Sequence, residues 1–334
     1  MEPTQSDKGS QRGIVAAIAA AAGLLAASAV ANHQRARQAE QEHPPAGRFI
    51  EIEGVRVHYI EQGLGPVVVL LHGVGVTAED YKASGLLATL SQRHRVVAFD
   101  RPGYGYSERP LGRSWTAQAQ ADLLAQACTA LGIERAVIVG HSWGTLVALQ
   151  MALSHPHRVA GLVLVSGYYF PTPRVDSLLL GIPAIPVLGQ LMRHTVSPAL
   201  GYLLTPRMIR RMFAPNPVPD EFHAAVPLAL MLRPGQLRAA AQDAGRMVAT
   251  AAELSQRYSE VTIPTAIIAG NEDELVQPDA QSAKLASVLP RAEIEMIPHG
   301  GHMLHHFETE RVAEAVNRLY SQFDLIAGES PPVT

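Results

Sequence analysis

A serine lies at the centre of the segment AVIVGHSWGTLVA, residues 136–148. The apolar run before it predicts a buried strand, and the pattern after Gly144 predicts a helix, so Ser142 falls where the two meet. An abrupt strand-to-helix turn strains the backbone and leaves no room for side chains two positions before and after the serine. Gly140 and Gly144 remove that conflict. The pattern predicts a nucleophile held above the edge of a sheet.

A serine hydroxyl attacks a carbonyl only when a base takes its proton and an acid orients the base. In this arrangement the acid follows the serine along the chain. The strand TAIIAG, 265–270, leads into GNEDELVQP, where Asp273 stands three residues beyond the strand. We expect Asp273 to be the acid, with Glu272 and Glu274 as its rivals.

The base is expected after the next strand, EIEMIP, 293–298, which leads into HGGHMLHHFETE. His302 follows two glycines and precedes a new helix, so it can reach back over the sheet edge. We expect His302 to be the general base. The neighbouring histidines are expected to face solvent or to pack: His299, His305 and His306.

The negative charge that develops on a carbonyl oxygen needs hydrogen-bond donors. The amide of Trp143, directly after the serine, is one expected donor. The second is the amide of Val74, in the loop LLHGVGV that follows the apolar strand at 67–73. His72 in this loop is expected to organise it rather than to carry a proton.

Strand and helix patterns alternate from residue 48 onward, which predicts an α/β fold with a mostly parallel central sheet and helices on both faces. Residues 168–255 hold apolar helical stretches without a strand pattern, and we expect a helical cap there rather than a separate second domain. The expected organisation is an N-terminal segment and linker at 1–47, a core at 48–167 and 256–322, the cap at 168–255 and a tail at 323–334.

The N-terminus contains IVAAIAAAAGLLAASAVA, residues 14–31, without a charge. This length is about the minimum for a membrane-spanning helix, although its many alanines make insertion marginal. We expect a single N-terminal membrane anchor. Two alternatives stay open: a signal sequence cleaved near Ala31, and an alanine-rich helix outside any membrane. The polar residues 32–47 are expected to form a linker.

Composition excludes several functions. The net charge is −3 and no basic patch stands out, so nucleic acid is not an expected partner. The single cysteine, Cys128, cannot form an intrachain disulfide and is expected to be a buried apolar residue. No cysteine or histidine spacing is typical of a metal site, and the predicted chemistry requires no cofactor.

Taken together, the motifs GHSWG, LLHG, FDRPGYGYS (99–107), GNED and GGH resemble the α/β-hydrolase fold family over roughly residues 48–322. The resemblance implies Ser142 as nucleophile, Asp273 as acid, His302 as base and a helical cap over the pocket. It also implies a structural role for Asp100 and Arg101 in the loop beside the pocket. Epoxide hydrolases and haloalkane dehalogenases share the Trp after the nucleophile but carry aspartate where this chain has serine. A serine suits attack on a carbonyl carbon.

We therefore expect a serine hydrolase of small to medium apolar carboxylic esters or lactones. The same triad also serves carbon–carbon bond hydrolases, amidases or prolyl aminopeptidases, and cofactor-free peroxidases. A peptidase would need a carboxylate in the cap, for which Asp220 and Glu221 are candidates. A non-catalytic ligand-binding protein on the same fold is the third class. Several residues could give the cap an apolar pocket: Tyr168, Tyr169, Phe170, Met208, Met212 and Phe213.

Overall fold

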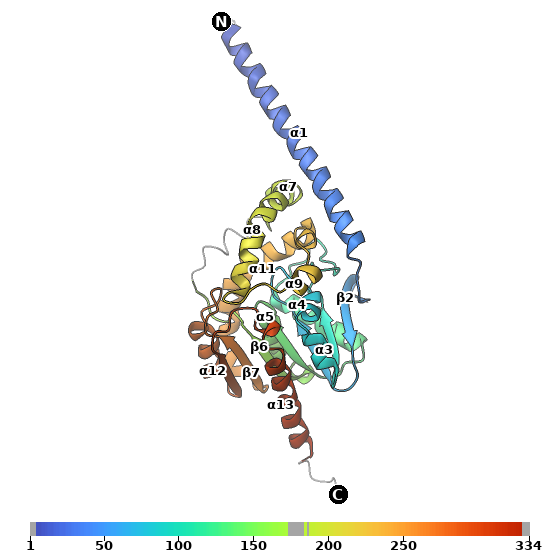
Figure 1. Ribbon diagram of the computed structural model, residues 1–334, viewed down its shortest axis with the longest axis vertical. Coiled ribbons are helices and arrows are strands. Elements are labelled where there is room, and N and C mark those ends of the chain that lie inside the picture. Colours follow the sequence, from blue (N-terminus) through green and yellow to red (C-terminus); the bar gives the residue numbers. More distant parts are fainter. Residues whose placement is uncertain (1–4, 173–183, 186, 329–334) are drawn as a thin grey trace.

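A computed structural model describes residues 5–172, 184–185 and 187–328, with side chains described between residues 13 and 322. The core of the molecule is an eight-stranded sheet with the strand order β1-β2-β4-β3-β5-β6-β7-β8. Figure 1 shows the helices that surround it. The strands are β1 Arg48–Ile52, β2 Val55–Gln62, β3 Val67–Leu71, β4 Arg95–Phe99, β5 Ala136–His141, β6 Val159–Val165, β7 Thr265–Gly270 and β8 Ala292–Ile297.

The β1–β2 and β2–β4 pairs are antiparallel, and all other pairs are parallel. This arrangement confirms the predicted α/β fold with a mostly parallel sheet. Because the parallel strands have covered faces on both sides, alternate residues enter two different apolar cores. In β3, for example, Val69 and Leu71 pack on one face and Val68 and Leu70 on the other.

Helices cover both faces of the sheet. The helices on one face pack against Val69 and Leu71 of β3. Cys128 belongs to the same apolar cluster and is buried, as predicted. Burial raises the pKa of the Cys128 thiol to about 12.

The core helices are α2 Glu79–Ala83, α3 Leu86–Ser91, α4 Ala117–Ala130, α5 Gly144–Ser154, α12 Lys284–Val288 and α13 Thr309–Gly328. Short helical turns are η1 Pro156–Arg158, η3 Tyr258–Glu260, η4 Asp279–Ala283 and η5 Leu304–His306.

Three features of the core differ from the sequence-based expectation. The single helix expected at about 78–90 is divided into α2 and α3, because Gly85 has a left-handed backbone with φ of 76°. The helices η4 and α12 between β7 and β8 were not predicted. The final helix continues to Gly328, past the expected start of the tail at residue 323.

The segment between β6 and β7 contains the helices α7 Leu188–His194, α8 Val196–Phe213, α9 Asp220–Ala225, α10 Leu228–Met231 and α11 Pro234–Ser255. They lie above the sheet in Figure 1, where the helical cap was expected. Residues 173–183 and 186 of the predicted cap lie outside the described residues. An apolar cluster joins cap residues such as Phe213 and Phe222 to Val76 and Met303 of the core. The cap therefore packs directly on the loops that follow the strands.

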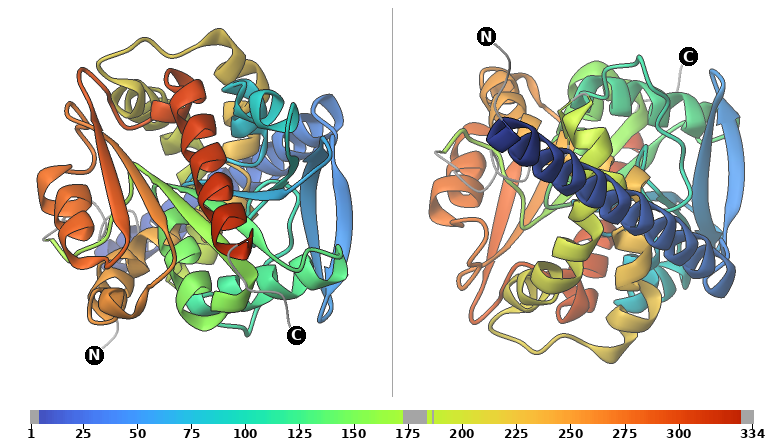
Figure 2. Two further views of the ribbon diagram at one scale, coloured as in Figure 1. Left: turned by 90° about the horizontal axis from the view of Figure 1, so that it is seen from below. Right: turned by 90° about the horizontal axis from the view of Figure 1, so that it is seen from above.

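Helix α1 extends from Gln5 to Glu42. The predicted linker is thus helical over most of its length, and only the residues around 43–47 are irregular. Figure 2 shows α1 crossing the cap when the molecule is seen from above. Ser28 Oγ donates to the carbonyl oxygen of Thr195 at 2.7 Å, and Asn32 Nδ2 donates to the same oxygen at 2.9 Å. The second half of α1 is therefore attached to the cap.

Candidate active site

Ser142 occupies the turn between β5 and α5. Its φ is +50°, a left-handed conformation that a residue with a side chain adopts only under strain. The turn is held by its own hydrogen bonds: the Ser142 amide donates to Val165 at 2.9 Å, and the Thr145 amide donates to the Ser142 carbonyl at 3.0 Å. The half-buried Ser142 side chain therefore projects from a rigid turn, as the sequence predicted.

The two glycines around the serine are sterically required. A Cβ on Gly140 would lie 2.8 Å from Thr145 Cα, and one on Gly144 would lie 2.1 Å from the carbonyl oxygen of Leu71. Both obstacles are backbone atoms, which cannot rotate away as a flexible side chain can. The close approach of α5 to β3 depends on the missing side chains.

His302 and Asp273 lie beside the serine. The Ser142 Oγ is 3.0 Å from His302 Nε2, and His302 Nδ1 is 2.7 Å from Asp273 Oδ2. The other Asp273 oxygen, Oδ1, accepts from the amides of Leu275 at 2.8 Å and Val276 at 2.9 Å. Both His302 and Asp273 are buried. The structure thus brings the three predicted residues together in the geometry of an oriented base next to a nucleophile.

The rival acids and histidines lie elsewhere. Glu272 pairs with the exposed His299 at 2.6 Å, and Glu274 pairs at the surface with Arg211 at 3.4 Å. His305 and His306 are directed away from the serine and bond to the buried Asp80 instead (at 2.8 Å each). None of these rivals hydrogen-bonds Ser142 or His302 within the described part of the chain.

The loop after β3 passes directly beside the serine. A Cβ on Gly73 would lie 3.1 Å from Ser142 Cβ, which is a tight contact that the absent side chain avoids. The amides of Val74 and Trp143 are expected to bind the oxyanion. Among the described residues, neither of these two backbone N–H groups donates to a protein acceptor. Both amides thus remain available to a ligand, and their assignment as the oxyanion hole stays a prediction.

His72 is held inside the same loop as a neutral group. Its Nδ1 donates to the Gly73 carbonyl at 2.8 Å, and its Nε2 accepts from the Arg101 amide at 2.9 Å. Burial, assisted by the positive charge of Arg101, lowers the pKa of His72 to about 4. Both ring nitrogens thus bond to backbone groups, one in this loop and one in the loop after β4, which agrees with an organising role. Asp100 likewise braces neighbouring loops through the amides of Ala78 and Tyr106.

Asp80, His305 and His306 form a buried cluster that the sequence pattern did not reveal, because α2 supplies the aspartate from more than 200 positions away. Their ligand atoms lie within 4.8 Å of one another, close enough to surround a metal ion. The two imidazole N–H groups already satisfy both carboxylate oxygens. Burial raises the pKa of Asp80, but the interactions and hydrogen bonds with His305 and His306 outweigh it and hold that pKa far below its usual value.

The aromatic and methionine side chains expected to line a cap pocket have different surroundings. Tyr169 and Phe170 belong to the main apolar core, whereas Met212 and Phe213 belong to the cap cluster beside Met303. Met208 is 40% exposed on α8. Tyr169, Phe170, Met212 and Phe213 thus pack in buried apolar clusters.

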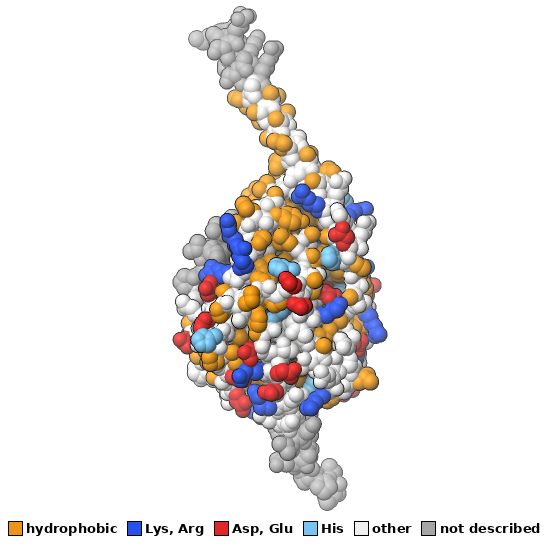
Figure 3. All heavy atoms as spheres, viewed as in Figure 1, with side chains coloured by type: hydrophobic (Ala, Val, Ile, Leu, Met, Phe, Trp, Pro, Cys, Tyr) orange, Lys and Arg blue, Asp and Glu red, His pale blue; other side chains and the backbone are white. Residues whose placement is uncertain are grey.

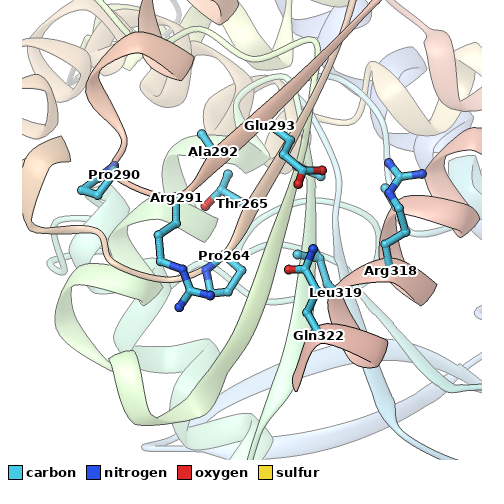
Figure 4. A pocket seen from close by; sticks show the side chains of 11 residues that line it. Pro264, Thr265, Pro290, Arg291, Ala292, Glu293, Arg318, Leu319 and Gln322 are labelled. Atoms are coloured by element: carbon cyan, nitrogen blue, oxygen red, sulfur yellow. The ribbon is translucent and has the colours of Figure 1, made fainter. Parts of the chain in front are cut away.

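Two cavities lie near different ends of the sheet. One of about 470 Å³ lies beside the loop after β3; its lining includes Thr77, Glu221, Leu230, Met231 and Gln236. The other, of about 400 Å³, is shown in Figure 4. Its lining includes Thr265 and Ala292, the first residues of β7 and β8. It therefore opens at the end of the sheet opposite the triad and does not belong to the candidate active site.

Comparison with known families now gives the class of protein. A family model described as the alpha/beta hydrolase fold matches residues 66–309, most of the chain. The chain therefore belongs to the α/β-hydrolase fold family, as the motifs indicated, and is an enzyme of the hydrolase type.

Individual relatives differ in chemistry. The chain is 29% identical over 299 residues to 2-hydroxymuconate semialdehyde hydrolase of Pseudomonas sp. (strain CF600), covering 86% of this chain and 99% of that protein. A thermophilic esterase from Thermogutta terrifontis matches with a TM-score of 0.68 at 23% identity, covering 83% and 99%. A bacterial membrane phospholipase A matches with a TM-score of 0.61 at 22% identity, covering 95% and 99%. The two structural likenesses are evidence of the fold alone.

Proposed function

We propose that this chain is a serine hydrolase that cleaves apolar carboxylic esters or lactones through an acyl-enzyme on Ser142. The observation that carries the proposal is the 3.0 Å contact between Ser142 Oγ and His302 Nε2, with Asp273 2.7 Å behind the imidazole. A hydroxyl next to an oriented neutral imidazole is suited to attack on a carbonyl carbon.

The reaction follows from this geometry. His302 Nε2 takes the Ser142 proton as Oγ bonds to the carbonyl carbon, and Asp273 stabilises the imidazolium that forms. The Val74 and Trp143 amides receive the oxyanion. His302 then gives its proton to the departing alcohol oxygen, and the acyl group remains on Ser142. A water molecule, deprotonated by His302, attacks this ester, and the acid leaves as the proton returns to Ser142.

The surroundings support an apolar substrate. The 470 Å³ cavity beside the loop after β3 is bordered in part by apolar cap residues, among them Leu230 and Met231, although the three triad residues are not part of its lining. A Cβ on Gly75 would touch Met231 Cε at 3.8 Å, so the cavity adjoins the loop that carries Val74. Burial of an acyl chain against apolar walls favours binding by about 0.8 kcal/mol per buried methylene.

We further propose that α1 anchors the enzyme in a membrane. The part of α1 from Gly13 is long and apolar enough to cross a bilayer, and none of its most apolar window is buried. A signal sequence passes the same test, so it is the alternative. Figure 3 shows hydrophobic side chains along α1 and over the adjoining top of the body. Exposed apolar residues on the adjacent helices α7 and α8 include Leu188, Leu191, Leu200, Leu203 and Leu204.

An anchored enzyme would meet lipophilic esters at the membrane surface. The match to the membrane phospholipase A covers 95% of this chain. Residues 48–322 make up a smaller share of the chain, so the structural likeness extends beyond the catalytic body. Acyl esters of phospholipids therefore belong among the substrates to be tested.

Carbon–carbon bond hydrolysis is the second candidate, because a 2-hydroxymuconate semialdehyde hydrolase is 29% identical over nearly its full length. Amide cleavage would need a carboxylate for the substrate amine. Glu221 borders the 470 Å³ cavity, and both Glu221 and Asp220 are exposed. A ligand-binding protein without catalysis would keep the fold but would not need an activated serine.

The first experiment is labelling of the full-length protein with a fluorophosphonate probe. We expect wild type to react and Ser142→Ala to remain unlabelled. A folded wild-type protein that does not react would contradict the proposal and favour a non-catalytic role.

The second experiment compares substrates. We expect p-nitrophenyl esters of increasing acyl length, or phosphatidylcholine in mixed micelles, to be cleaved faster than a vinylogous diketone or an aminoacyl anilide. Faster turnover of the diketone would establish the carbon–carbon hydrolase, and faster turnover of the anilide would establish a peptidase.

A further inference from the structure

Asp243, on the cap helix α11, is buried between two arginines of the core. Its Oδ2 accepts from Arg101 Nη1 at 2.6 Å and from the Tyr104 hydroxyl at 3.0 Å, while Oδ1 accepts from Arg109 Nη2 at 3.0 Å. Asp243 and Arg101 are both 0% exposed. Burial would raise the pKa of Asp243, but Arg109 and Arg101 outweigh it and hold that pKa below its usual value. The carboxylate is therefore a fixed negative charge contributed by the cap.

Arg101 connects Asp243 to the loop after β3, which contains Val74. Its Nε donates to the His72 carbonyl at 2.8 Å, and its Nη2 donates to the Gly73 carbonyl at 3.0 Å. The Gly73 carbonyl and the Val74 N–H belong to one peptide unit. Because that unit is planar and trans, holding the carbonyl on one side aims the N–H to the other. The guanidinium thereby sets the direction of the Val74 amide.

The other proposed donor is connected to the same pair. The Trp143 indole N–H donates to the backbone carbonyl of Asp243 at 3.1 Å. The Arg101 guanidinium also lies 4.7 Å from the centre of the Trp143 ring, within the range of a cation–π contact. The position of Trp143, and with it the start of α5, is thus fixed from the cap side as well.

We propose that Asp243 is a positioning residue for the oxyanion hole, through which the cap holds Arg101 and thereby orients the amides of Val74 and Trp143. The inference rests on the proposed function, since it concerns the same site. Donors that are already oriented stabilise an oxyanion without reorganisation during the reaction. Packing of the cap on the core then also orients the two donors of the oxyanion hole.

Arg101→Lys is the main test, because lysine keeps a positive charge opposite Asp243 but cannot bond both loop carbonyls with a fork of N–H groups. With p-nitrophenyl butyrate, we expect kcat to fall about 10- to 100-fold with little change in KM. Affinity for an aryl trifluoromethyl ketone, which forms a tetrahedral oxyanion on the serine, should fall by a similar factor. Asp243→Asn should produce the same pattern.

Gln242→Ala is the matched control. Gln242 neighbours Asp243 on α11 and accepts from Arg109 Nε at 2.8 Å, but it has no hydrogen bond with Arg101 among the described residues. We expect this variant to keep wild-type kcat and ketone affinity. Thermal melting and fluorophosphonate titration of active sites correct each rate for the folded fraction.

The inference is overturned if folded Arg101→Lys keeps kcat and ketone affinity within twofold of wild type, even if its melting temperature falls; that result would leave the bridge a purely structural role. Arg101→Lys decides the question should Asp243→Asn fail to fold. An unlabelled wild-type protein would instead overturn the proposed function and this inference with it.

Discussion

The imidazole of His302 and the carboxylate of Asp273 come from loops after two neighbouring parallel strands, and their Nδ1 and Oδ2 atoms lie 2.7 Å apart. The second oxygen of Asp273 is fixed by two backbone amides. The carboxylate therefore cannot rotate freely, and it selects the His302 tautomer whose Nε2 is free to accept a proton from Ser142.

Asp273→Asn should therefore lower kcat by about 10⁴-fold, because an amide can present its NH₂ to His302 and favour the wrong tautomer. Ester hydrolysis at saturating substrate measures the effect. Glu272→Gln is the matched control, since Glu272 pairs with the exposed His299 outside the triad. An equal loss in the two variants would contradict the assignment of Asp273 as the acid.

Gly144→Ala tests the turn that presents the nucleophile. The new Cβ would lie 2.1 Å from the Leu71 carbonyl oxygen, so α5 must move away from β3. We expect the free energy of unfolding to fall by about 2 kcal/mol or more, and fluorophosphonate labelling of Ser142 to slow. Urea denaturation measures the first effect.

Gly235→Ala serves as its control, because nothing lies within 4 Å of a Cβ at that helical position. Alanine there should leave stability unchanged or raise it by up to about 1 kcal/mol. If Gly144→Ala were as stable and as reactive as Gly235→Ala, the steric account of the serine turn would be wrong.

The parts of the site that the sequence predicted are those encoded by local patterns. Ser142 lies between a strand pattern and a helix pattern. The glycine two positions to either side is required because a side chain there would collide with nearby backbone. Asp273 and His302 lie in the loops that follow two neighbouring strands, and parallel strands end at one edge of a sheet. Position relative to a strand end was therefore sufficient to place these residues in the same region.

Residues that depend on pairing between distant segments could not be placed in this way. Asp243 lies in an amphipathic helix, where a charged residue ordinarily faces water, and only the approach of Arg101 and Arg109 makes its burial favourable. The partnership of Asp80 with His305 and His306 likewise joins segments at opposite ends of the core. Neither arrangement leaves a periodic signal in the chain.

Acid should weaken the fold through His72. Its pKa is about 4 in the folded protein against 6.5 as the ordinary value, so the unfolded chain binds the proton more tightly. The stability that this group contributes is full above pH 6.5 and is lost as the pH falls from 6.5 to 4; by pH 4 the loss is about 3 kcal/mol. His72→Gln, which cannot titrate, should lose less stability over this interval than wild type. Denaturant unfolding at pH 7 and pH 4 measures both, and equal losses would contradict a buried neutral His72.

Leu24→Arg tests the membrane anchor. Leu24 is 73% exposed and lies near the middle of the apolar stretch of α1. Because the stretch is rich in alanine, its insertion into a bilayer is only weakly favourable. An arginine at the centre of a spanning helix costs about 2.5–3.5 kcal/mol, which should move the protein from the membrane pellet to the soluble fraction after alkaline extraction. Leu111→Arg, at an 82% exposed position on the catalytic body, should stay with the membrane. A soluble wild-type chain that begins near Asn32 would show instead that this segment is a cleaved signal.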